Sequence, residues 1–116
     1  MKKIYLLLLC LIAMGTMAQT YQFTVYNTVN SGIPANNIND FKKSPTGTYW
    51  IATNNGLSAM IGSSFTTYNT SNSGIATNIL RKIAIGTNNT VYATTYGDGI
   101  VLRNGTSWSH FTTANS

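Results

Sequence analysis

The sequence predicts an all-β fold made of two successive units of four short antiparallel strands, and three observations lead to this prediction. The chain has 116 residues, enough for one small domain. From residue 19 onwards, about half of the residues are Thr, Asn, Ser or Gly, which favour strands and tight turns. Glutamate is absent and leucine is scarce after residue 18, so few residues favour helices. The third observation is an internal repeat.

The repeat has a period near 42 residues. Residues 23–26 align with residues 65–68 at this offset, and residues 30–33 align with residues 72–75 in the same order. A third, partial copy of the pattern begins at Trp108. Repeats of about 40 residues with four strands each are typical of β-propeller blades. We therefore expect about two four-stranded blades of an incomplete propeller, which follow a signal peptide.

The first blade is predicted over residues 30–68, where turn residues separate four short β-prone runs. Pro45 and Gly47 occupy turn positions between the first and second runs. Asn54, Asn55 and Gly56 form a tight hairpin turn, because Asn and Gly tolerate positive φ. A further turn follows at Gly62. The expected strands are residues 38–42, 49–53, 57–61 and 65–68.

The second blade is predicted over residues 69–111, with the same order of elements. Its expected strands are residues 79–85, 91–95, 100–103 and 108–111. The pattern departs from the first blade at an inserted Gly97-Asp98 pair. Residues 19–29 are expected to form the end strand of a preceding blade, and residues 112–116 to begin a further repeat. We expect Trp50 and Trp108 to pack the blades together.

Residues 1–18 have the pattern of a secretory signal peptide. Lys2 and Lys3 precede an apolar run over residues 4–12, and Ala18 closes a cleavage site of small residues. The run is too short to span a bilayer as a helix. We therefore expect an exported protein, periplasmic or extracellular, without stable membrane insertion after cleavage. Leu9 stands where a lipoprotein signal needs Gly or Ala before Cys10, which argues against lipidation.

The composition argues against several classes of function. Charged residues make up 8% of the chain and the net charge is +5, unlike a basic nucleic-acid-binding arm. One Cys, one His and two Asp are too few for most hydrolytic or metal chemistry. We therefore predict no catalytic residues, no metal site, no cofactor and no nucleic-acid partner.

A candidate binding face follows from the predicted topology. In a four-strand meander, the turn between the second and third strands and the loop between blades lie at the same edge. That edge is rich in amides, which can donate to and accept from sugar hydroxyls. The alternative is that these Asn residues only form turns. The candidate ligand-binding residues are Tyr96, Asp98, Asn54, Asn55, Asn30 and Asn72, with Asn36 and Asn78 nearby. Tyr96 and Asp98 belong to the insertion, and departures from a repeat are often functional.

The order of these residues resembles the two-component regulator propeller repeat. The match is carried by residues 31–36, Gly47, residues 50–53, Gly56, Leu57, Phe65 and Tyr68, and by Ser73, Gly74, Asn78, Ala93, Thr94 and Gly99. Ser44 and Val91 depart from the family pattern, which has Asp and Trp there. Such repeats form periplasmic sensor regions of bacterial hybrid two-component systems and occur in related secreted proteins. The resemblance therefore implies extracytoplasmic sensing.

Together these features predict a non-catalytic propeller segment that binds a ligand or a partner. Two alternatives remain at this stage: a structural repeat region of a surface protein, or a fragment of a propeller lyase or glycosidase. A closed propeller needs about four to eight blades, so two blades leave apolar faces open. The expected partners are further blades, from a longer chain or from self-association, and carbohydrate.

Overall fold

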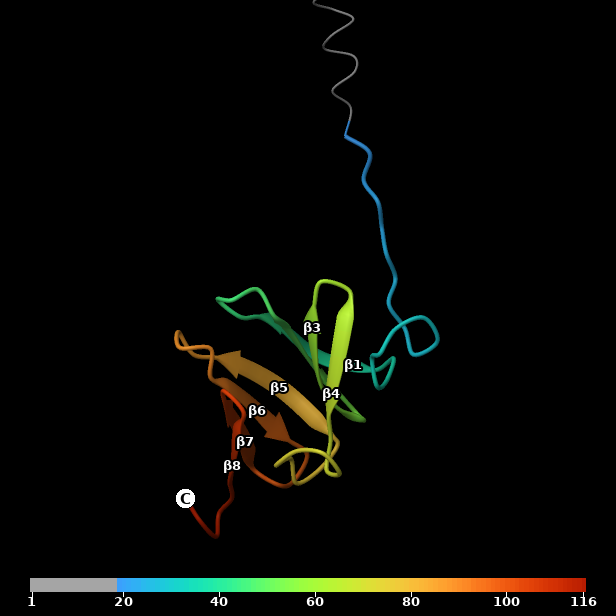
Figure 1. The fold of residues 1–116 in the computed structure, drawn as a ribbon. Helices are drawn as coiled ribbons and strands as arrows, with labels where there is room; N and C mark the ends of the chain where they lie inside the picture. The colour runs from blue at the N-terminus through green and yellow to red at the C-terminus, as the bar shows by residue number, and fades with distance from the viewer. Residues whose placement is uncertain (1–18) are drawn as a thin grey trace, which may run out of the picture.

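The computed structural model describes residues 19–116, which form eight strands in two sheets and no helix (Figure 1). The first sheet has the order β1 (Ile38–Lys43), β2 (Tyr49–Thr53), β3 (Gly56–Ile61) and β4 (Ser64–Tyr68). The second has the order β5 (Leu80–Ile85), β6 (Val91–Thr95), β7 (Ile100–Asn104) and β8 (Ser107–Phe111). All neighbouring strands are antiparallel. The predicted all-β fold of two four-stranded blades is confirmed, and the predicted signal peptide lies outside the described residues.

The strand bounds agree with the expected ranges to within one or two residues, except near the start of the described chain. Residues 19–29 form no strand, so the expected end strand of a preceding blade is absent. In Figure 1 this blue segment runs away from both sheets. A strand requires a neighbouring edge to supply its backbone hydrogen bonds, and this segment pairs with no strand in the described part. Phe23 is consequently 93% exposed.

A threonine organises the turn between the second and third strands of each blade. Thr53 accepts the N–H of Asn55 at 3.0 Å and donates its hydroxyl to the carbonyl of Gly56 at 2.8 Å. Thr95 makes the same two contacts across the longer second turn, with its hydroxyl 2.9 Å from the carbonyl of Gly99. Gly56 has a φ of 116°, and a Cβ there would lie 2.6 Å from the carbonyl oxygen of Tyr68. Only glycine fits this position.

The core lies between the two blades rather than within either one. Its residues are the buried apolar side chains on the facing surfaces, namely Trp50, Ala52, Leu57 and Ala59 of the first blade and Ile75, Leu80, Ile83, Val91, Ala93 and Val101 of the second. Leu57 and Leu80 are completely buried. A fully buried leucine contributes about 1.5–3 kcal/mol relative to an exposed one. Each blade is thus stabilised mainly by its contact with the other.

Arg103 on β7 joins the blades at the edge of this core. Its guanidinium carbon lies 4.7 Å from the ring centre of Tyr68, 5.3 Å from that of Trp50 and 5.6 Å from that of Trp108. A guanidinium nitrogen also donates to the Tyr68 hydroxyl at 3.2 Å. Cation–π contacts of this kind contribute about 0.5–2 kcal/mol each, depending on how far they are desolvated. The two tryptophans therefore pack at the junction of the blades, as expected from the sequence.

Asp40 makes a second polar contact between the blades. Its carboxylate accepts the Ile83 N–H of the other blade at 2.8 Å and pairs with Lys42 at 2.9 Å. Burial of the carboxyl opposes ionisation, but the N–H of Ile83, the Lys42 ammonium and the N–H of Phe41 outweigh it. These donors lower the pKa of Asp40 to about 2. The contact between blades therefore favours the ionised carboxylate.

The lowered pKa predicts a loss of stability in acid. A carboxyl whose pKa is lower in the folded state stabilises the fold above its unfolded pKa of about 3.9, and this contribution disappears as the pH falls towards 2. We expect the free energy of unfolding to fall by about 1–2 kcal/mol from this group between pH 5 and pH 2. Asp40→Asn should lose that part of the pH dependence.

Denaturant unfolding at a series of pH values measures this effect. The matched control is Asp98→Asn, which removes an exposed carboxylate from a loop outside the contact between blades. An Asp40→Asn protein with the full pH dependence of the parent would show that Asp40 does not supply it.

Candidate functional site

The predicted binding face forms along one edge of the two blades. The turn between β2 and β3 joins the inter-blade loop through the N–H of Gly56, which donates to the carbonyl of Asn78 at 2.7 Å. The loop between β6 and β7 joins the same stretch through the N–H of Tyr96, which donates to the carbonyl of Ile79 at 3.1 Å. The two turns therefore flank one segment of the inter-blade loop.

Asn30 and Asn72 have a structural role within their loops. In each, the side-chain oxygen accepts the N–H three residues earlier at 2.8 Å. The side-chain nitrogen donates to the carbonyl five residues earlier at 2.8 Å in Asn30 and 2.9 Å in Asn72. Asn115, at the equivalent position of the third, partial repeat, makes the same pair of bonds. The turn-forming interpretation thus accounts for both candidate residues.

Asn36 and Asn78 also stabilise loop backbone. Each side-chain oxygen accepts the N–H eight residues earlier at 2.9 Å. Each repeat therefore has a loop in which two asparagines bind main-chain groups: Asn30 and Asn36 in the first, Asn72 and Asn78 in the second.

Asn54 and Asn55 lie exposed on the turn between β2 and β3 and retain free hydrogen-bonding capacity. The side-chain oxygen of Asn54 accepts the amide of Asn39 at 2.8 Å, and Asn39 also donates to the carbonyl of Leu80 at 2.6 Å. The side-chain amide of Asn55 donates to the carbonyl of Pro34 at 3.2 Å. Sequence reasoning missed Asn39, because nothing distinguishes it from the many turn asparagines.

The inserted loop carries the other two candidate residues, Tyr96 and Asp98. Tyr96 is 64% exposed, and the Arg81 guanidinium carbon lies 4.8 Å from the centre of its ring. Asp98 is exposed, and its carbonyl contacts the Nε2 atom of His110. Sequence reasoning did not select Arg81 for the site. Arg81 and Tyr96 directly follow Leu80 and Thr95, which pair across β5 and β6, and this register brings the two side chains together.

Several kinds of functional group are exposed along this edge. The edge presents an aromatic ring, a guanidinium, a carboxylate and two side-chain amides. Within residues 19–116, no group of three or more His, Cys, Asp or Glu side chains is placed to hold a metal ion. The described part of the chain also contains no helix long and apolar enough to cross a membrane.

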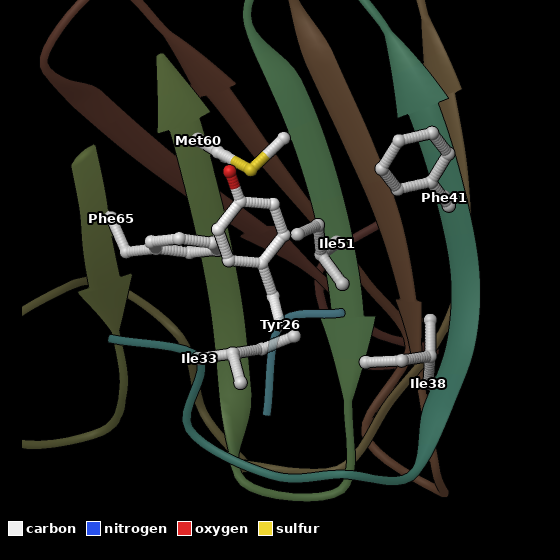
Figure 2. A pocket seen from close by; sticks show the side chains of 7 residues that line it. All are labelled: Tyr26, Ile33, Ile38, Phe41, Ile51, Met60 and Phe65. Carbon is white, nitrogen blue, oxygen red and sulfur yellow. The ribbon is translucent and has the colours of Figure 1, made fainter. Parts of the chain in front are cut away.

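A hollow lies on the face of the first blade that is turned away from the second blade (Figure 2). It measures about 270 Å³ and is lined by apolar side chains from β1, β2, β3, β4 and the preceding loop. The lining residues are Tyr26, Ile33, Ile38, Phe41, Ile51, Met60 and Phe65. Figure 2 shows Tyr26 standing over the strands beside Phe65, and the two ring centres are 5.3 Å apart. This is one of the open faces that two blades were expected to leave.

The structural role of Asn72 is testable by substitution. Asn72→Ala removes two hydrogen bonds from the exposed inter-blade loop, which should lower the free energy of unfolding by about 1 kcal/mol. Thermal unfolding followed by circular dichroism measures the change. Asn37→Ala is the matched control, because the Asn37 side chain is exposed and makes no hydrogen bond to the described residues. Equal melting temperatures for the two variants would contradict the assignment.

Comparison with known proteins shows similarity in structure alone. No family model matches the sequence, and no curated protein matches it. Solved structures do match, among them the extracellular domain of the putative hybrid two component system BT3049 from B. thetaiotaomicron. That match has a TM-score of 0.69 and 19% identity, and it covers 84% of this chain. It spans 14% of the other chain. The protein thus has the fold of part of a two-component extracellular domain, consistent with its resemblance to the two-component regulator propeller repeat.

Proposed function

We propose that this chain is an exported, non-catalytic pair of propeller blades from an extracytoplasmic sensor, and that its loop edge binds carbohydrate. The fold similarity to an extracellular domain of a hybrid two-component system supports export and sensing. The observation that carries the ligand proposal is the inserted loop, where the exposed Tyr96 lies beside Arg81 and Asp98 is also exposed. This loop is where the second blade departs from the first.

Tyr96 supplies the apolar part of the proposed site. The C–H face of a sugar ring packs on an exposed aromatic ring, and the ring loses little conformational entropy because it has two side-chain torsions. Arg81 lies 4.8 Å from the ring centre, and this contact restrains the ring further. The contact with Arg81 therefore favours one orientation of the exposed ring.

The polar groups of the edge complement sugar hydroxyls, which both donate and accept. The oxygen of Asn54 is already bonded to Asn39, so its amide hydrogens remain available as donors. Asn55 uses its amide on Pro34, so its oxygen remains available as an acceptor. The Asp98 carboxylate accepts, and the Arg81 guanidinium donates. A guanidinium beside the ring also suits a sugar acid.

Calorimetric titration with soluble neutral and uronic-acid-containing oligosaccharides tests the proposal. We expect saturable binding that Tyr96→Ala weakens at least tenfold, because the stacking surface is removed. Tyr21→Ala is the matched control, since Tyr21 is 78% exposed but lies in the extended segment before the blades. Absence of saturable binding to all the sugars, or equal binding by the Tyr96→Ala protein, would overturn the carbohydrate assignment.

A further inference from the structure

The open face of the first blade has the same layout as the surface of the second blade that the first blade covers. In the first sheet, Ile51 pairs with Phe41 and with Ser58. In the second, Ala93 pairs with Ile83 and Val101 at the same ladder positions, and all three of these residues are buried by the first blade. The open face of the first blade therefore has the layout of a surface that another blade covers.

The aromatic contacts repeat this correspondence. Tyr26 and Phe65, at the hollow of Figure 2, have ring centres 5.3 Å apart. Tyr68 and Trp108, at the covered junction of the blades, also have ring centres 5.3 Å apart. A glycine allows the loop before the first blade to pass close to Phe65, because a Cβ at Gly32 would lie 2.8 Å from the Cβ of Phe65. The equivalent Gly74 approaches Trp108 in the same way.

The far side of the second blade carries the complementary surface. Tyr92, Ile100 and Phe111 are 41%, 43% and 44% exposed. Their ladder positions match those of Trp50, Leu57 and Tyr68, the residues with which the first blade covers the second. One chain thus presents both halves of a contact that it already makes internally.

We propose that the open face of the first blade is a docking surface for the second blade of another copy of this chain. The copies then join head to tail, with the geometry of the internal contact between blades. A contact between two different surfaces of identical subunits either closes into a ring or continues as a filament. Three copies place six blades in a ring, within the range of about four to eight that closed propellers use.

The two repeats carry different residues at one pair of equivalent positions. This difference favours a second copy of the chain as the occupant of the open face. Across the internal junction, Arg103 donates to the hydroxyl of Tyr68. The ladder positions equivalent to these two residues are Met60 on the open face and Phe111 on the far face. The guanidinium and the hydroxyl are therefore both absent from the proposed junction. Met60 and Phe111 make an apolar pair there, so this position leaves no polar side chain unpaired.

Assembly requires the start of the described chain to move. Tyr26 occupies the position that Phe111 of the neighbouring copy takes in the joined form, since both correspond to Tyr68 in the repeat. Residues 19–26 form no strand, whereas Phe111 lies on β8, which is paired along β7. Residues 19–26 of one copy are therefore displaced by β8 of the neighbouring copy. Residues 112–116 of that neighbour are displaced in turn by residues 27–31 of the first copy, to which they are equivalent in the repeat.

Size exclusion with light scattering on the exported chain tests the proposal. We expect a discrete, concentration-dependent oligomer with β-sheet circular dichroism. Phe41→Asp blocks the first face and Phe111→Asp blocks the second, so each protein alone should be monomeric and folded. An equimolar mixture should give a heterodimer, because one intact junction remains between the two proteins. Tyr96→Asp, which lies on the loop edge, should assemble like the parent.

A further variant tests the role of the first residues. Tyr26→Ala removes the side chain that competes with Phe111 of the neighbouring copy, so it should lower the protein concentration at which half of the chains are assembled. Each tenfold decrease corresponds to about 1.4 kcal/mol of binding free energy lost by the Tyr26 side chain at the open face. A folded parent that stays monomeric at all concentrations would overturn the proposal. An oligomer that survives both aspartate substitutions, or a mixture that gives no heterodimer, would also overturn it. If Phe41→Asp is unfolded, Phe41→Ser replaces it on the first blade. If Phe111→Asp is unfolded, Ile100→Lys replaces it on the second blade.

Discussion

The structure depends on the apolar contact between the two blades. A four-stranded sheet of five- and six-residue strands has two faces and cannot bury either one by itself. Leu57 of the first blade and Leu80 of the second are fully buried because each sheet covers the other. Arg103 and Asp40 extend this contact with polar links at its margins. The loops that carry the candidate ligand groups are therefore held in place by a core shared between two blades.

Repetition explains how so simple a composition specifies a definite geometry. Equivalent threonines shape the two turns, and equivalent asparagines close the loops with bonds to the same relative positions. These Thr and Asn side chains, which are the same in the two repeats, bond to the backbone. The inserted loop of Tyr96 and the replacement of Arg103 by Met60 are the two differences on which the functional proposals rest.

Much of the fold could be predicted from the sequence, because Gly and Asn mark the turns and the repeat checks each assignment twice. The lack of a strand over residues 19–29 could not be predicted, since strand formation depends on a partner edge that no local pattern supplies. The site was predictable only in part. Turn chemistry already suggested structural roles for Asn30 and Asn72. The contacts of Arg81 and Arg103 with aromatic rings were not predictable, because a charged residue on a strand usually indicates a solvated position.

Native-state hydrogen exchange tests most directly whether the two blades share one core. The protected amides of β2 and β6 should exchange through a common opening with the same free energy. Leu80→Val removes one buried methylene from the second blade and should cost about 1 kcal/mol. The account predicts an equal loss of protection in β2 and β6. Loss confined to β6, with β2 unchanged, would mean that the first blade is stable without the second and would contradict the account.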